Sequence, residues 1–295
     1  MTRTEHVQTK REIQALLAGA GLRPRRRFGQ HFLIDGNLMR RLVEVAEIQP
    51  DDLVLEVGAG TGGLTDLLAQ RAGGVVAVEI DRGLRGLLDT RFAHQPAVRL
   101  VAGDVLKSKH SLCDEVADAL HRHAATHGAR VLLVANLPYQ VATPLVMNLL
   151  VDYPVVRRLC FTVQAEVGER ILAASGEKSF GPLSVVSQAL CEASLIARVP
   201  PQAFWPVPRV DSVMIRMDVC KSPFNSAAQA ALFATFVRSV FDHRRKTLRS
   251  ALRYVLEEPQ REAFCERFDA TRRPEDFSAD EWIEMFGQLS ATAAP

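Results

Sequence analysis

Four residues that can act on an amino group follow one apolar segment of the sequence. The segment Val131 to Ala135 is typical of a strand buried on both faces, and it is followed directly by Asn136, Leu137, Pro138 and Tyr139. Because proline cannot donate to a ladder, we expect the strand to end here. The carboxyl ends of strands are where open α/β sheets bind ligands.

The types of these four residues suit chemistry on an aromatic amino group, whose lone pair is delocalised into its ring. The amide oxygen of Asn136 and the carbonyl of Leu137 or Pro138 could accept both N–H bonds and favour a pyramidal nitrogen, while Tyr139 stacks on the base. Placed dipoles of this kind stabilise a transition state without a strong base. A plain strand-to-loop turn with a packed tyrosine fits the same residues, so the tetrapeptide alone leaves both interpretations open.

A glycine-rich loop comes earlier in the chain. A strand expected at residues 51–57 runs into Gly58-Ala59-Gly60-Thr61-Gly62-Gly63 and then into a helix. Glycines let the backbone approach a ligand closely. The next expected strand, residues 75–78, is followed by Glu79, where an acid would accept hydrogen bonds from ribose hydroxyls. The sequence therefore indicates a nucleotide site.

The identity of that nucleotide is left open by the loop itself. Gly58, Gly60 and Gly63 satisfy the G-x-G-x-x-G pattern, which also occurs in NAD-binding proteins. Two acids favour S-adenosylmethionine instead. Glu56 precedes the glycines, and Asp104 ends the third expected strand, where it could bind an adenine amino group.

Composition limits the class of protein. The 295 residues are 47% hydrophobic, which supports a folded core. No apolar run approaches the roughly 20 residues of a membrane span, and the N-terminus lacks the apolar core of a signal peptide. The five cysteines form no C-x-x-C pair, so neither disulfides nor a zinc site is indicated. We expect a cytoplasmic monomer without a metal.

Positive charge is unevenly distributed, although the net charge is only +2. Clustered basic side chains can neutralise phosphates, and both clusters here lie beside aromatic residues. They predict contact with nucleic acid, although an ordinary solvated surface fits them too. Their members are Arg23, Arg25, Arg26 and Arg27, and Arg244, Arg245, Lys246 and Arg249.

The order of apolar patterns and breakers predicts an α/β fold in three parts. These are an N-terminal helix and basic arm (1–35), a Rossmann-like domain (36–222) and a smaller all-helical C-terminal domain (223–295), since strands disappear after residue 225. Within the second part, the proline-rich stretch from Pro200 predicts a rigid extended loop. We expect Phe204 to be an exposed aromatic that clamps a base against Tyr139, and Trp205 to fill a hydrophobic seam.

Seven stretches in the same order resemble the ribosomal RNA adenine dimethyltransferases of the small-subunit methyltransferase A type. The resemblance covers roughly Arg25 to Leu252, with the helical tail similar in character. The stretches are RRRFGQHFLID, LEVGAGTGGLT, VAVEID, AGD, ANLPYQVATPL, AFWPVPRVDSVMIRM and FDHRRKTLRSAL.

The resemblance implies a set of roles. Gln30, His31 and Leu33 would close over the methyl donor, S-adenosylmethionine. The loop at Gly58 and Gly60 would meet its methionine part, Glu79 its ribose and Asp104 its adenine, and Asn136 would also contact the donor. Asn136, Leu137, Pro138 and Tyr139 match the family's catalytic tetrapeptide, Phe204 an aromatic that holds the target adenine. The HRRKTLRSAL segment matches the basic start of the family's helical domain, which would contact RNA. The residues expected to bind RNA are Arg25, Arg26, Arg27, Arg244, Arg245, Lys246 and Arg249. The implied domain labels are a methyltransferase domain and an RNA-contacting helical domain.

The implied reaction is dimethylation at N6 of two adjacent adenines near the 3′ end of 16S rRNA, in a 30S particle during ribosome biogenesis. The sequence departs from the family at His31 and Gln140, where Asn is common, and its N-terminal arm and its 104–136 interval look longer than usual. Three alternatives stay open: a large-subunit rRNA dimethylase conferring antibiotic resistance, a non-catalytic RNA-binding assembly factor and an NAD oxidoreductase.

Overall fold

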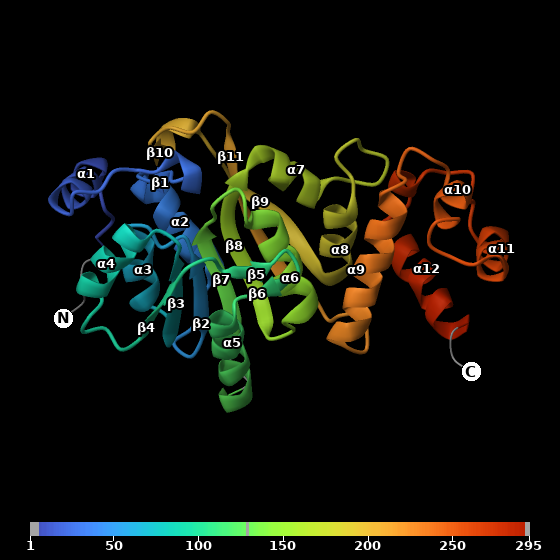
Figure 1. The fold of residues 1–295 in the computed structure, drawn as a ribbon, viewed down its shortest axis with the longest axis horizontal. Helices are drawn as coiled ribbons and strands as arrows, with labels where there is room; N and C mark the ends of the chain where they lie inside the picture. Colours follow the sequence, from blue (N-terminus) through green and yellow to red (C-terminus); the bar gives the residue numbers. More distant parts are fainter. Residues whose placement is uncertain (1–5, 128–129, 293–295) are drawn as a thin grey trace. The chain divides into compact units, whose positions relative to one another are not determined.

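The computed structural model describes residues 6–127 and 130–292 (Figure 1). A seven-stranded sheet runs through it in the order β4-β3-β2-β7-β8-β11-β9. β2, β3, β4, β7 and β8 are parallel neighbours, and β11 is antiparallel to β8. The strands are β2 (Leu53–Val57), β3 (Gly74–Glu79), β4 (Val98–Ala102), β7 (Val131–Asn136), β8 (Val156–Gln164), β9 (Cys191–Val199) and β11 (Ser212–Val219). The predicted α/β fold is confirmed.

The strand order reverses between β2 and β7. The chain builds β3 and β4 on one side of β2, then returns to place β7 on the other side. At such a switch point the crossovers leave in opposite directions, so a crevice opens at the carboxyl ends of the two strands. The glycine-rich loop follows β2 and the Asn136 tetrapeptide follows β7, so both begin at this crevice.

Helices cover this sheet because their apolar positions repeat at helical spacing. One core cluster joins α2 and α3 to alternate residues of the strands, such as Val75 and Ala77 of β3 and Leu132 and Val134 of β7. Asp35 caps α2 and Asp81 caps α4 by accepting backbone N–H bonds. The first six helices along the chain are α1 (Lys10–Gly19), whose Ile13 and Leu17 pack with Leu84 instead of with the sheet, α2 (Gly36–Ala46), α3 (Gly63–Ala69), α4 (Arg82–Arg91), α5 (Asp114–His127) and α6 (Ala142–Asp152).

Two segments predicted to be irregular contain short strands. The basic arm forms η1 (Arg26–Phe28) and β1 (Phe32–Leu33), and the proline-rich loop forms η2 (Pro201–Ala203) and β10 (Phe204–Trp205). β1 and β10 pair antiparallel, with Phe32 opposite Trp205 and Leu33 opposite Phe204. A second hairpin pairs β5 (Leu106–Ser108) with β6 (Ser111–Leu112) just before the helix that begins at Asp114.

The chain divides into two compact units. Unit 1 contains residues 1–148, 155–168 and 194–218, and unit 2 contains residues 149–154, 169–193 and 219–295. Helices of the second unit include most of α7 (Ala165–Leu172), then α8 (Pro182–Leu190), α9 (Ala227–Phe241), α10 (Leu248–Leu252), α11 (Glu258–Arg267), η3 (Pro274–Asp276) and α12 (Ala279–Thr292). The three-part functional division at residues 35 and 222 stays a prediction, and its ends at residues 1 and 295 lie outside the described residues.

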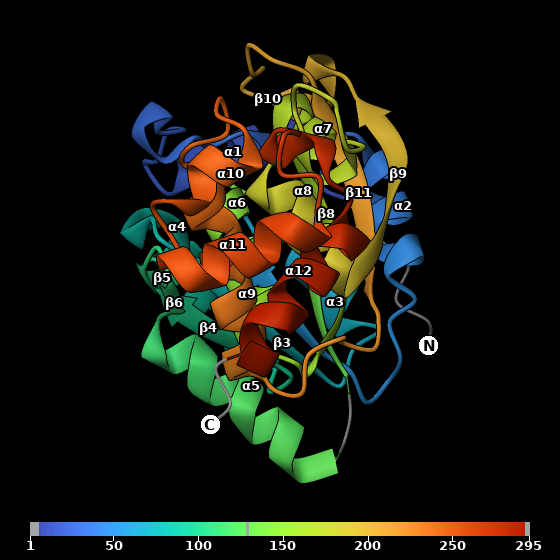
Figure 2. The same ribbon diagram turned by 90° about the vertical axis from the view of Figure 1, so that its right-hand side faces the viewer.

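Unit 2 has its own aromatic core, whose helices Figure 2 shows in orange and red. The indole of Trp282 is fully buried and meets Phe236 and Phe241 of α9 at ring-centroid distances of 5.8 and 5.5 Å. Aromatic pairs at such distances add to the free energy gained from burial alone. Within the described ranges, no helix is both long and apolar enough to cross a bilayer.

Candidate active site

The glycine-rich loop lies against the Asn136 tetrapeptide. Gly58 and Gly60 have φ values of 83° and 60°, a region that side chains with a Cβ rarely adopt. A Cβ added to Gly58 would lie 3.0 Å from Cγ of Pro138. The loop therefore needs glycine there both for its backbone conformation and for its approach to the tetrapeptide.

Glu79 ties the glycine loop to the end of β3. Its side chain is buried, and its two oxygens accept the backbone N–H groups of Gly60 at 2.8 Å and Asp81 at 2.9 Å. Burial raises the pKa of Glu79, because the surroundings disfavour its charged form more than these hydrogen bonds favour it. Glu79 thus holds the loop while its carboxylate keeps acceptor capacity toward the cleft.

Glu56, which precedes the glycines, makes a buried structural hydrogen bond and does not face the cleft. Its side chain is 1% exposed, and its Oε2 accepts the hydroxyl hydrogen of Thr65 at 2.6 Å. Burial, with a smaller contribution from the nearby charge of Glu79, raises the pKa of Glu56 to about 8. Glu56 is absent from the lining of the cleft.

Asp104 follows β4 after Gly103 and is exposed. One of its oxygens, Oδ1, accepts the N–H of Leu106 at 2.9 Å. Ile80, 41% exposed, lines the same cleft as Asp104 and Glu79. The cleft thus presents an exposed apolar side chain together with two carboxylates.

Asn136, the last residue of β7, is held by two hydrogen bonds. Its Nδ2 donates to the carbonyl oxygen of His31 at 2.9 Å. A carbonyl oxygen can only accept, so this bond fixes which way the amide faces. Oδ1 therefore faces Thr162 on β8, whose hydroxyl donates to it at 2.5 Å. The second lone pair of Oδ1 is free to accept from a substrate.

Tyr139 is oriented by its hydroxyl and by a neighbouring ring. The hydroxyl is hydrogen-bonded to the hydroxyl of Ser212, at the start of β11, with 2.8 Å between the two oxygens. The ring lies 6.0 Å from that of His31, with 24° between their planes. Burial raises the pKa of Tyr139, so the phenol stays neutral and can serve as a flat stacking surface.

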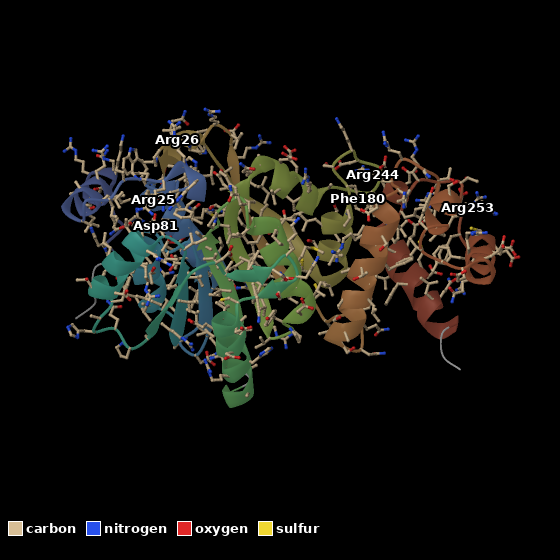
Figure 3. All side chains as sticks on the ribbon, in the orientation of Figure 1. Arg25, Arg26, Asp81, Phe180, Arg244 and Arg253 are labelled. Carbon is tan, nitrogen blue, oxygen red and sulfur yellow. The ribbon has the colours of Figure 1, made fainter. Side chains whose placement is uncertain are left out.

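The basic arm closes over the same cleft. Gln30 donates to Asp81 at 3.1 Å and accepts the N–H of Arg25 at 2.7 Å. Arg25 also reaches the Asp81 carboxylate at 3.3 Å, and Figure 3 labels this pair. The His31 ring bonds the Pro206 carbonyl at 2.6 Å. Arg25 therefore makes contacts within the protein, to Asp81 and Gln30, and its contact with RNA stays a prediction.

One cleft brings most of the predicted site residues together. They are Gln30, His31, Gly58, Gly60, Glu79, Asp104, Asn136, Leu137, Pro138 and Tyr139. Leu33 and Phe204 are not in its lining. Both are buried in the core cluster that contains α2 and α3, at 4% and 1% exposure. The prediction of an exposed Phe204 is wrong, because its pairing opposite Leu33 turns both side chains to that core.

The remaining basic residues differ in how they are used. Arg27 lies over the ring of Phe28 at 4.6 Å, and Arg26 is exposed. In unit 2, Arg244 pairs with Glu275 at 2.7 Å, and Lys246 bonds the hydroxyl of Tyr254 at 2.5 Å. Arg245 and Arg249 are exposed. RNA contact by any of them stays a prediction.

Three residues of the site were missed in the sequence: Thr162, Ser212 and Gln8. Gln8 accepts the hydroxyl hydrogen of Thr61 in the glycine loop at 2.7 Å. None of them has a local signal, since each becomes relevant only through a partner more than twenty residues away. In the described part of the chain, no group of three or more His, Cys, Asp or Glu side chains is arranged to hold a metal ion.

Comparison with known proteins agrees with this geometry. Residues 21–290 match the family model described as ribosomal RNA adenine dimethylase. A protein named ribosomal RNA small subunit methyltransferase A from Moorella thermoacetica is 40% identical over 84% of this chain and 85% of its own. A protein of the same name from Geobacillus kaustophilus is 36% identical over 98% of this chain and 97% of its own.

Two solved structures share the fold. A dimethyladenosine transferase from Plasmodium falciparum superposes with a TM-score of 0.69 at 20% identity, covering 88% of this chain and 98% of that one. The 23S rRNA methyltransferase ErmE gives a TM-score of 0.60 at 24% identity, covering 88% and 99%. The fold is thus the Rossmann-like fold of methyltransferases. On the family match and the extent of the identity, the chain belongs to the ribosomal RNA adenine dimethylase family.

Proposed function

We propose that this protein transfers methyl groups from S-adenosylmethionine to N6 of two adjacent adenines near the 3′ end of 16S rRNA, dimethylating each. The observation that carries the proposal is that the fixed Asn136 amide and the glycine loop line one cleft. Identities of 36–40% to relatives named small subunit methyltransferase A support the choice of the small subunit. The cytoplasm, a 30S particle as substrate and a monomeric enzyme belong to the same proposal.

The residues of the cleft fit the donor. An adenosine needs an apolar surface for its base and acceptors for its ribose hydroxyls and its amino group. Ile80 offers the surface, Glu79 and Asp104 offer the acceptors, and the positive-φ glycines let the loop approach closely. When bound, S-adenosylmethionine supplies an electrophilic methyl group on a sulfonium centre.

Asn136 prepares the nucleophile. Its Oδ1 is aimed by Thr162 and keeps a lone pair for one N6–H bond. The Pro138 carbonyl already accepts the N–H of Val141 at 3.2 Å, so we assign the second N6–H bond to the Leu137 carbonyl. Drawing both hydrogens away from the ring plane localises the nitrogen lone pair. This stabilisation is greatest in the transition state.

Tyr139 holds the base, and water receives the proton. With its hydroxyl fixed by Ser212, the ring presents one orientation to a purine extruded from its stack. An alkylated aromatic ammonium is a strong acid, so its proton leaves to solvent without a general base. Phe204 does not serve as the clamp in this arrangement because it is buried at 1% exposure.

The test is incubation of the protein with tritiated S-adenosylmethionine and unmodified 30S particles, followed by mapping of dimethyladenine. The expected result is label at two adjacent adenines near the 3′ end of 16S rRNA. Parallel incubation with 50S material tests large-subunit specificity. Label only on 50S RNA, or donor binding without label on either RNA, would overturn the proposal in favour of the other dimethylase type or an assembly factor.

A further inference from the structure

A second hollow in unit 1 adjoins the cleft and is not used by the reaction described above. We name it the Trp205 groove. Its volume is about 1060 Å³, near the upper limit of roughly 300–1,000 Å³ for small-molecule sites. It is lined by the end of α1 and the following loop, by Tyr139 and Gln164, and by the chain from Trp205 to Val210.

The Trp205 groove is continuous with the cleft. Gln30, His31 and Tyr139 line both hollows. Tyr139 is the residue that we assign to stack on the extruded adenine. A strand that places one base in the cleft must therefore run on past Tyr139, and this groove borders the cleft there.

The charge of the groove suits a phosphate backbone. Arg23, Arg26 and Arg209 line it and are all exposed, and its lining within the described residues holds no Asp or Glu. Among the described residues, none of the three forms an ion pair, whereas their neighbour Arg25 reaches Asp81. Figure 3 labels Arg26 on the arm. Uncompensated arginines along a hollow are typical of surfaces that bind nucleic-acid backbones.

An aromatic side chain lies in the same groove. Trp205 is half-buried, and its ring lies 6.2 Å from that of Phe32 with 22° between the planes. The β1–β10 pairing places these two residues opposite each other, so Phe32 supports the indole from the arm. A supported, partly exposed indole beside free arginines is the combination that binds a base and its phosphate.

We propose that the Trp205 groove binds the nucleotide next to the reacting adenine, with its base on Trp205 and its phosphates at Arg209 and Arg26. The proposal rests on the proposed function. Because that function modifies two adjacent adenines, one of them occupies the groove while the other is in the cleft. The groove would then set both the affinity for single-stranded RNA and the distribution of methyl groups between the two adenines.

The first test is steady-state methylation of unmodified 30S particles by Trp205→Ala, Trp205→Phe and Arg209→Ala. Loss of one stacking contact should raise the KM for RNA about tenfold in Trp205→Ala, while Trp205→Phe stays within about threefold of the parent. The donor Kd should not change. Arg209→Ala should raise the KM and lower the salt dependence of binding by about one ion. Arg99→Ala, an exposed arginine outside the groove, is the matched control.

The second test needs no methyl transfer. The chain has two tryptophans, and Trp282 is fully buried. Titration with a single-stranded adenine-rich oligonucleotide should therefore quench the fluorescence of Trp205, and Trp205→Phe should lose the quenching and keep the affinity. A protein that binds the oligonucleotide without quenching, or Trp205→Ala and Arg209→Ala variants with the parent's KM, would overturn the proposal for the groove. Quenching in a protein that labels no ribosomal RNA would overturn the proposed function but would not contradict nucleotide binding in the groove.

Discussion

The hydroxyl of Thr162 donates a hydrogen bond to Oδ1 of Asn136 at 2.5 Å, between two residues that are paired across β7 and β8. Thr162 is fully buried, so no solvent replaces this bond if it is removed. It aims the one side-chain oxygen that we assign to the target amino group.

Thr162→Val should lower kcat about tenfold, which corresponds to about 1.4 kcal/mol of transition-state stabilisation. The shape of the side chain is kept and only the hydroxyl is lost, so the donor Kd should stay the same. Thr162→Ser should restore most of kcat, because it restores the hydroxyl. Equal kcat in the Val and Ser variants would show that the hydrogen bond has no part in positioning Asn136.

Asn136→Ala should reduce methyl transfer at least about a hundredfold, as removal of a placed polar group does in other enzymes. Donor binding should be mostly retained, because Glu79 and Asp104 are unchanged. Calorimetry with S-adenosylmethionine and labelling of 30S particles separate the two effects. Full activity in this variant would refute the assignment of the tetrapeptide.

Gly58→Ala should weaken donor binding and slow transfer together. The added Cβ would lie 3.0 Å from Cγ of Pro138 at a φ of 83°, so either the loop or the tetrapeptide must shift. Gly86→Ala is the matched control: its Cβ would meet nothing within 4 Å in the helix α4, so it should keep activity and gain up to about 1 kcal/mol of stability. Donor Kd and melting temperature are the measurements.

Glu56→Gln should change how stability depends on pH. Burial raises the folded-state pKa of Glu56 from 4.5 to about 8, so between these values the native state holds a proton that the unfolded chain has released. The free energy of unfolding of the parent therefore falls as pH rises through this window. Glutamine cannot ionise, so the melting temperature of the variant minus that of the parent should increase from pH 5 to pH 9. Parallel curves across this range would contradict the buried, protonated state.

Substitutions in the basic cluster of unit 2 should separate folding from RNA contact. Arg244 pairs with Glu275 and donates to the Lys178 carbonyl, so Arg244→Ala should lower the melting temperature. Arg245→Ala and Arg249→Ala remove exposed side chains and should weaken RNA binding, with a smaller salt dependence and an unchanged melting temperature. Unchanged RNA affinity in the last two variants would remove them from the RNA-contacting surface.

Sequence reasoning located the parts of the site that are local in the chain. Each of these parts lies at the carboxyl end of a strand: Asn136 ends β7, Glu79 ends β3, and Gly58 and Asp104 follow β2 and β4. The parallel strands of a sheet bring their carboxyl ends to one edge. Composition and spacing therefore sufficed to predict the α/β fold and eight of the residues that line the cleft, whereas Gln30 and His31 were predicted only from the family resemblance.

The contacts between segments that lie far apart in the chain could not be predicted from the sequence. The β1–β10 pair joins residues more than 170 positions apart. Its register buries Phe204, which was predicted to be exposed, and leaves Trp205 half-buried, packed against an apolar cluster as predicted and also lining the groove. The bonds that aim Asn136 likewise come from His31 and Thr162. Sequence by itself determined which residues can do the chemistry. Tertiary structure alone decided which of them face the substrate, because a one-residue change of register turns a side chain from the core to the solvent.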